Sequence, residues 1–83
     1  MNKADILQFN KLKLQFYEKE LWTSEIRVRG TKQLIDALKE KVLENDCKAH
    51  RESLEEIELR LEVLEKWHAF DKNKVEYYQY QIN

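Results

Sequence analysis

The chain contains no proline and only one glycine, Gly30, in 83 residues. Sandwiches and barrels of β-strands need frequent turns, and Gly and Pro are the residues that most often form them. Helices need neither residue, and the helix-favouring Leu, Glu, Lys and Gln are abundant along the chain. The scarcity of turn residues therefore predicts an all-α protein with long, coiled-coil-like helices.

The chain is too short to bury a large core by itself. A domain of this length buries only about 60–65% of the surface that its unfolded chain exposes, so small domains often depend on disulfides, a metal or a partner chain. The single cysteine, Cys47, excludes an internal disulfide and favours a reducing compartment, so a cytoplasmic location is expected. A partner chain is then the expected source of stability, and a homodimer is its simplest form.

Apolar residues predict a first helix over residues 3–28. Leu7, Leu14 and Leu21 recur every seven residues, and most other apolar residues of this region fall within about half of the helix circumference. A face this broad suits contact with two neighbours better than with one. The first helix is therefore expected to pack against more than one other helix.

The only glycine predicts where the chain turns. Glycine costs about 1 kcal/mol inside a helix relative to alanine but is favoured just past a helix end. Thr31 comes directly after Gly30 and is a suitable N-cap, because its hydroxyl accepts from free N–H groups of a first turn. We therefore expect a turn near 29–31 and a longer second helix over about 32–70.

The apolar pattern of this second region changes register near residues 50–54. A first helix of 20–25 residues would span about 30–38 Å and, folded back, would reach about as far as the register change. One interpretation is therefore a single long helix that exchanges its intrachain partner for another chain at this point. The sequence favours this interpretation, because the stretch contains neither Gly nor Pro.

The alternative is a break in the helix near 45–53. Asn45, Asp46 and Cys47 are weak helix formers, and Ser53 followed by Glu56 fits a capping box. The tail over 71–83 is rich in tyrosine and could form a strand. Its apolar residues continue the spacing of the preceding helix, so a helix that frays towards its end is expected.

Two groups of side chains are predicted to contact other chains. The expected self-association seam consists of Leu54, Ile57, Leu61 and Leu64, and the additional contact surface consists of Trp67, Phe70 and Tyr78. Both groups lie beyond the expected reach of the first helix, and aromatic residues are common interface anchors. The sequence thus predicts one domain, 1–83, folded as an antiparallel helical hairpin with a longer second helix that dimerises.

A basic cluster lies beside the predicted turn. Arg27, Arg29 and Lys32 could contact nucleic-acid phosphates, but cations at the end of a first helix also complement the helix dipole. The net charge is only −1, and neither half of the chain carries a strong positive field. The dipole interpretation is favoured, and nucleic-acid binding is kept as the alternative.

Two pairs of residues have the spacing of metal ligands. Cys47 and His50 share a helix face, and Glu65 and His68 match the Glu-x-x-His pair of di-iron bundles. Each pair supplies two ligands, whereas zinc sites use three or four protein ligands and di-iron sites use more. The sequence also lacks phosphate-binding and nucleophile motifs, so no metal, no cofactor and no enzymatic activity are expected.

Together these observations predict a small, non-enzymatic protein–protein interaction module. It would act as a regulator, adaptor or inhibitor by binding itself and an unidentified partner protein. The alternative is a nucleic-acid-associated regulator that contacts phosphates through Arg27, Arg29 and Lys32. No apolar run approaches the roughly 18 residues of a membrane span, so no membrane contact is expected.

Overall fold

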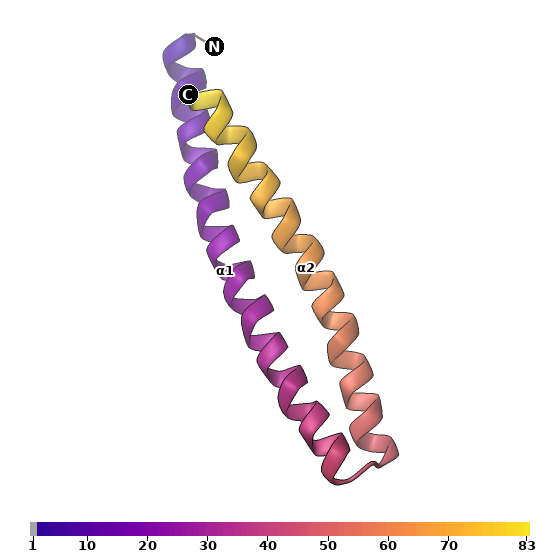
Figure 1. The fold of residues 1–83 in the computed structure, drawn as a ribbon. Helices are drawn as coiled ribbons and strands as arrows, with labels where there is room; N and C mark the ends of the chain where they lie inside the picture. Colours follow the sequence, from indigo (N-terminus) through magenta and orange to yellow (C-terminus); the bar gives the residue numbers. More distant parts are fainter. Residues whose placement is uncertain (1) are drawn as a thin grey trace.

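The computed structural model describes residues 2–83, which form two long α-helices joined by a short loop (Figure 1). Helix α1 comprises Lys3–Glu44 and helix α2 comprises Lys48–Ile82. The helices are antiparallel, so both chain ends lie at one end of the molecule and the loop lies at the other (Figure 1). Measured between Cα atoms, the molecule is 63 Å long and 14 Å in the two other directions. The predicted all-α helical hairpin is confirmed.

The turn predicted near 29–31 is wrong. Helix α1 continues through Gly30, which has no positive φ, and the chain turns only after Glu44. The continued helix buries Ile35 and half-buries Leu38 against α2. This packing outweighs the cost of about 1 kcal/mol for a glycine inside a helix.

The predicted helix boundaries change as a consequence. The single long helix over 32–70 does not exist, because the loop interrupts it at residues 45–47, inside the stretch of the alternative break. The first helix is the longer one, with 42 residues against 35. The tail over 71–83 continues α2 as helix as far as Ile82.

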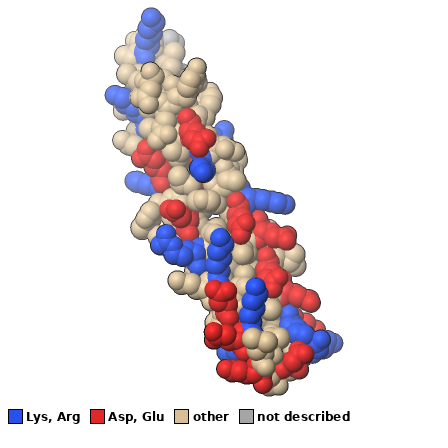
Figure 2. All heavy atoms as spheres, viewed as in Figure 1, with Lys and Arg blue, Asp and Glu red and all other residues tan. Residues whose placement is uncertain are grey.

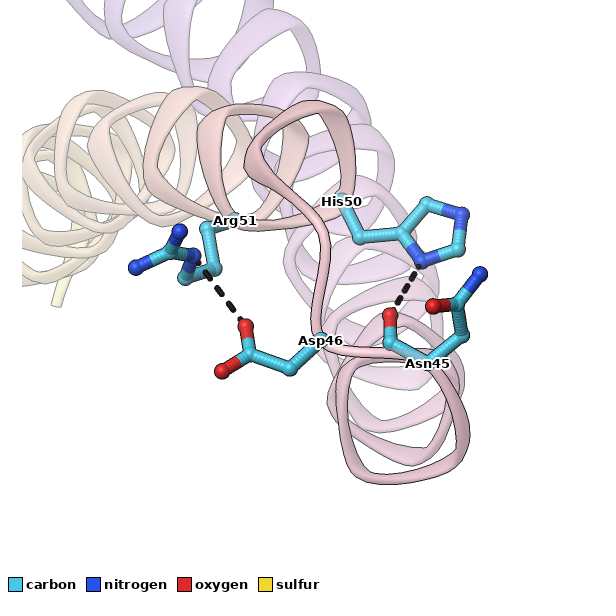
Figure 3. Close-up of polar contacts among 4 residues, drawn as sticks. All are labelled: Asn45, Asp46, His50 and Arg51. Carbon is cyan, nitrogen blue, oxygen red and sulfur yellow. Dashed lines mark hydrogen bonds and ion pairs between the residues drawn. The ribbon is translucent and has the colours of Figure 1, made fainter.

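Polar contacts close the loop between the helices (Figure 3). The Nδ1 atom of His50 lies 3.0 Å from the carbonyl oxygen of Asn45, and Nε of Arg51 lies 3.1 Å from Oδ1 of Asp46. The backbone N–H of Cys47 donates to the same Asn45 carbonyl at 2.9 Å. Weak helix formers and local polar contacts thus end α1 without Gly or Pro.

A stripe of buried and half-buried residues, which we call the seam, runs along the facing sides of both helices. Its members are alternately three and four residues apart, the spacing that keeps one stripe of a helix facing its neighbour. In α1 the seam consists of Asn10, Leu14, Tyr17, Leu21, Ser24, Val28, Thr31, Ile35, Leu38 and Val42. In α2 it consists of His50, Leu54, Ile57, Leu61, Leu64, His68, Asp71, Val75, Tyr78 and Ile82.

The core that this seam creates is thin. Among the described residues only two apolar side chains are buried, Ile35 at 6% exposure and Val75 at 7%. Two helices can enclose one stripe each, and the remaining apolar side chains have no third element to cover them. The hairpin by itself therefore leaves much of its apolar surface in water.

Candidate protein-interaction surface

The leucines predicted to join two chains lie inside the hairpin. Leu54, Ile57, Leu61 and Leu64 are half-buried seam residues of α2 that face α1 of the same chain. The sequence predicts no intrachain partner for them only because it places the turn too early. With the loop at 45–47, α1 extends alongside them, so they hold the hairpin together.

A polar pair sets the alignment of the two helices. The hydroxyl of Ser24 donates to the carbonyl oxygen of Leu21 at 3.0 Å, and its oxygen lies 3.2 Å from Nδ1 of His68. The Ser24 hydroxyl and Nδ1 of His68 are within hydrogen-bond distance, and the tautomer of the ring decides which of them donates. A polar pair in an otherwise apolar seam penalises shifted alignments, because a shift would leave its buried groups without partners.

One side of the hairpin carries most of the large exposed apolar side chains that lie next to the seam. These residues immediately precede seam residues: Phe9, Phe16 and Leu34 in α1, and Val63, Trp67, Phe70 and Tyr77 in α2. Leu34 lies apart from the others, nearer the loop, and we call the surface that the other six residues form the aromatic face. Of the predicted contact residues, Trp67 and Phe70 belong to it, whereas Tyr78 is half-buried in the seam.

The two helices contribute to the same side because they are antiparallel. In each helix, a residue that precedes a seam residue is rotated by about 100° from it around the helix axis, and the sense of this rotation is the same in both helices when each is viewed along its own chain direction. For antiparallel helices that face each other, rotation in the same sense leads to the same side of the pair. The ring contacts agree, since the ring centroids of Tyr17 and Phe70 lie 6.3 Å apart across the helices.

Ring contacts connect Phe16, Trp67, Phe70 and Tyr77 of the aromatic face, partly through the seam residues Tyr17 and Tyr78. The rings of Trp67 and Phe70 pack edge to face with centroids 6.2 Å apart, and Phe16 packs edge to face on Tyr17 at 5.1 Å. Two lysine ammonium groups lie over rings of this face, Lys13 at 5.6 Å from Phe9 and Lys74 at 5.5 Å from Phe70. Each geometry is a cation–π contact.

A shallow groove of about 340 Å³ lies in the middle of this side. Its walls include Glu20, Thr23 and Arg27 of α1 together with Val63, Trp67 and the seam carboxylate Asp71 of α2. The three α1 residues each precede a seam residue, as do Val63 and Trp67, so the groove confirms the side on which they lie. The groove offers an apolar floor flanked by charges of both signs.

The residues that come directly after seam residues form the opposite side, which is mostly charged. Glu25, Arg29 and Lys32 line a depression there together with Glu65 and His68. Trp22 is the large aromatic on this side and is 66% exposed. The two sides of the hairpin therefore differ in chemistry as well as in position.

The structure separates the basic cluster predicted from the sequence. Arg27 lies on the side of the aromatic face, whereas Arg29 and Lys32 lie on the charged side beside Glu25 and Glu65. All three are in the middle of α1, far from the end whose dipole they were expected to complement. The premise that they gather at a turn is wrong.

The two pairs with metal-ligand spacing, Cys47 with His50 and Glu65 with His68, gain no further ligand from the fold. Within residues 2–83, no three His, Cys, Asp or Glu side chains come together in a way that could hold a metal ion. His50 contacts the Asn45 carbonyl, and His68 contacts the Ser24 hydroxyl. Both imidazoles thus have structural partners in the loop and in the seam.

Four residues of the aromatic face are not identified from the sequence: Phe9, Phe16, Val63 and Tyr77. The signal that identifies them is their position immediately before seam residues. That signal becomes readable only when the loop is known, because the loop decides which stripe of each helix faces the other.

Neither helix of the described chain has a stretch long and apolar enough to cross a membrane. Comparison of the chain with protein families, with curated proteins and with solved structures finds no significant match. The interpretation of the surface therefore depends on its own geometry and chemistry.

Proposed function

We propose that this chain is a small, non-enzymatic protein–protein interaction module that binds through its aromatic face. The observation that carries the proposal is the grouping of exposed rings on one side of a hairpin with a thin core. Trp67 is 59% exposed, and Phe16 and Tyr77 are each 53% exposed. Contiguous apolar surface of this kind usually marks a site where another protein packs.

The composition of the face supports protein binding over other ligands. Aromatic residues are enriched at interface hot spots, where their large rings fill pockets on the partner. Charged residues at the edge of the face, such as Glu20 and Arg27, resemble the polar rim of an interface. A regulator, adaptor or inhibitor would need no more than such a surface on a rigid support.

The nucleic-acid alternative gains no support from the geometry. Binding of a phosphate backbone uses several cations along one surface, and the three candidates lie on two opposite sides. Glu25 and Glu65 flank Arg29 and Lys32, so carboxylates would repel a phosphate there. We therefore retain the protein-interaction module as the proposal.

Site-specific crosslinking tests the proposal. A photoreactive benzoylphenylalanine replaces Trp67 on the aromatic face in one variant and Trp22 on the charged side in the matched control. Both positions are exposed tryptophans, so the two variants differ in the side of the hairpin that they probe. After irradiation in the cells that make the protein, the adducts are identified by mass spectrometry.

Protein adducts at position 67 that are absent at position 22 are the expected result. Adducts of equal yield at both positions would indicate random collisions and would contradict the proposal. Adducts to nucleic acid, or none at position 67, would contradict it as well. A second copy of the chain and an unrelated protein both count as protein adducts in this experiment.

A further inference from the structure

We propose that the protein that covers the aromatic face is a second copy of this chain, packed antiparallel to the first. The two hairpins would be related by a two-fold axis that lies between them at mid-length, perpendicular to their long axes. Together they would form a four-helix bundle. This inference rests on the proposed function, because it names the occupant of the same face.

The size of the face fits such an assembly. The whole side of the hairpin that carries the face is 63 Å long and 14 Å wide between Cα atoms and covers on the order of 900 Å², and stable interfaces bury about 800 Å² per partner. A second hairpin has the same length and can cover the whole face. In a four-helix bundle each helix contacts two neighbours, which supplies the additional core that a single hairpin lacks.

The side of the hairpin that carries the aromatic face has its rings towards the chain ends and its smallest side chains towards the loop. The bulky residues Phe9, Phe16, Trp67, Phe70 and Tyr77 lie on the half of the molecule nearer the chain ends, or at its middle. On the half nearer the loop, the α1 residues that precede seam residues include the small Gly30 and Ala37 as well as Leu34 and Lys41, and those of α2 are Ala49, Ser53, Glu56 and Arg60. A Cβ atom built on Gly30 would meet nothing within 4 Å, so the surface is open at this position.

An antiparallel copy matches these two halves. It sets Phe16 and Phe9 of each α1 opposite Gly30 and Ala37 of the other α1, so these rings fill the space that the two small residues leave. A parallel copy would oppose rings with rings at one end and leave a gap at the other. Close packing without voids favours the antiparallel arrangement.

Charges near mid-length are also self-complementary in this arrangement. Glu20 and Arg27 both line the groove, and they lie at similar distances on either side of Thr23, close to the middle of α1. A two-fold axis there brings Glu20 of each copy next to Arg27 of the other. A two-fold interface repeats each such contact, so one favourable pair becomes two.

Charged side chains are also unevenly distributed along the length of the molecule. Figure 2 shows uncharged side chains dominating the end that holds the chain ends, whereas acidic and basic side chains crowd the end that holds the loop. The antiparallel arrangement keeps the two densely charged loop ends apart.

The native cysteine provides a direct test. A spin label on Cys47 reports the distance between the two loops in the full-length protein, and sedimentation equilibrium reports its mass. We expect twice the chain mass of 10.2 kDa, with a label separation of about 60 Å because the loops lie at opposite ends of the bundle. A parallel dimer would give a separation of about 20 Å, since packed helices lie only 8–10 Å apart.

A mass of 10.2 kDa up to high micromolar concentration would overturn the inference, and so would a short label separation. Such a result would leave the proposed function intact if crosslinking at position 67 still captured another protein. Loss of the position-67 adducts together with a monomeric mass would remove both proposals.

Paired variants locate the interface. Trp67→Glu is expected to raise the dimer dissociation constant at least a hundredfold, whereas the control Trp22→Glu leaves it within about threefold. Helical circular dichroism at high concentration checks that both variants still fold. Equal effects of the two substitutions on dimerisation would contradict the assignment of the face.

A charge exchange tests the arrangement itself. Glu20→Arg and Arg27→Glu are each expected to weaken the dimer roughly three- to tenfold, because each sets like charges together twice. The double variant Glu20→Arg/Arg27→Glu restores the opposite charges and should recover most of the affinity. Additive weakening in the double variant would overturn the antiparallel pairing.

Discussion

At the scale of single residues, Gly30 shows how local preference and tertiary packing can disagree. Its propensity predicts a helix end, yet α1 continues through it because Ile35 and Leu38 beyond it pack against α2. A preference of about 1 kcal/mol is small beside the burial of two large aliphatic side chains. The glycine remains as an open position on the aromatic side of α1 rather than as a hinge.

In the monomeric hairpin, for which Trp67→Glu serves as the background, Gly30→Ala is therefore expected to stabilise the fold by about 1 kcal/mol, because alanine favours the helix and its Cβ meets no atom of the chain within 4 Å. Urea unfolding followed by circular dichroism measures the change. Ala37→Gly, seven residues away on the same side of α1, is the matched control and should cost a similar amount. If Gly30→Ala were destabilising, the backbone there would have to depart from a regular helix.

At the scale of the helices, the seam determines which residues are structural and which remain available for binding. Leu61 lies in the seam, whereas Leu59, two residues earlier, is 63% exposed and points away from α1. The two leucines have the same chemistry and the same helix. Their positions relative to the seam alone decide their roles.

Leu61→Asp is expected to destabilise the hairpin by about 3 kcal/mol or more, because it removes a packed side chain and places a carboxylate between the helices. Leu59→Asp is expected to change the stability by less than about 0.5 kcal/mol. Urea unfolding of both variants measures the difference. Similar stabilities would show that the two helices do not face each other through the seam.

At the scale of the whole molecule, the hairpin is an incomplete core. Two helices bury Ile35 and Val75 but leave a connected set of rings on one side. A second hairpin on that side would turn the exposed rings into an interior, so folding and assembly would become one equilibrium. Stability would then depend on the concentration of the chain.

The melting temperature of the wild-type chain is therefore expected to rise by about 4 °C for each tenfold increase in concentration, given the unfolding entropy of two chains of this size. Thermal unfolding at several concentrations measures this slope. Trp22→Glu should keep the slope, and Trp67→Glu should abolish it. A wild-type melting temperature independent of concentration would show that the hairpin unfolds as a monomer.

The amino-acid sequence was enough to predict that this chain is helical and that part of its aromatic content lies outside the main apolar stripe, whereas the predicted fold-back rested on a turn at Gly30 that the structure does not contain. These conclusions depend on composition and on local periodicity, which act within a few residues of the chain. Trp67 and Phe70 could be proposed as contact residues for this reason, because they lie off the main stripe of their helix.

Only the tertiary structure decided where the chain turns, and the rest of the site depends on that position. A glycine in one place and three weak helix formers in another offered two turns of similar local cost. The chain turns at residues 45–47 because this turn gives α2 a partner along its length and pairs Ser24 with His68 inside the seam. Such long-range packing has no local signature, so Phe9, Phe16, Val63 and Tyr77 joined the candidate site only after the two helices were aligned.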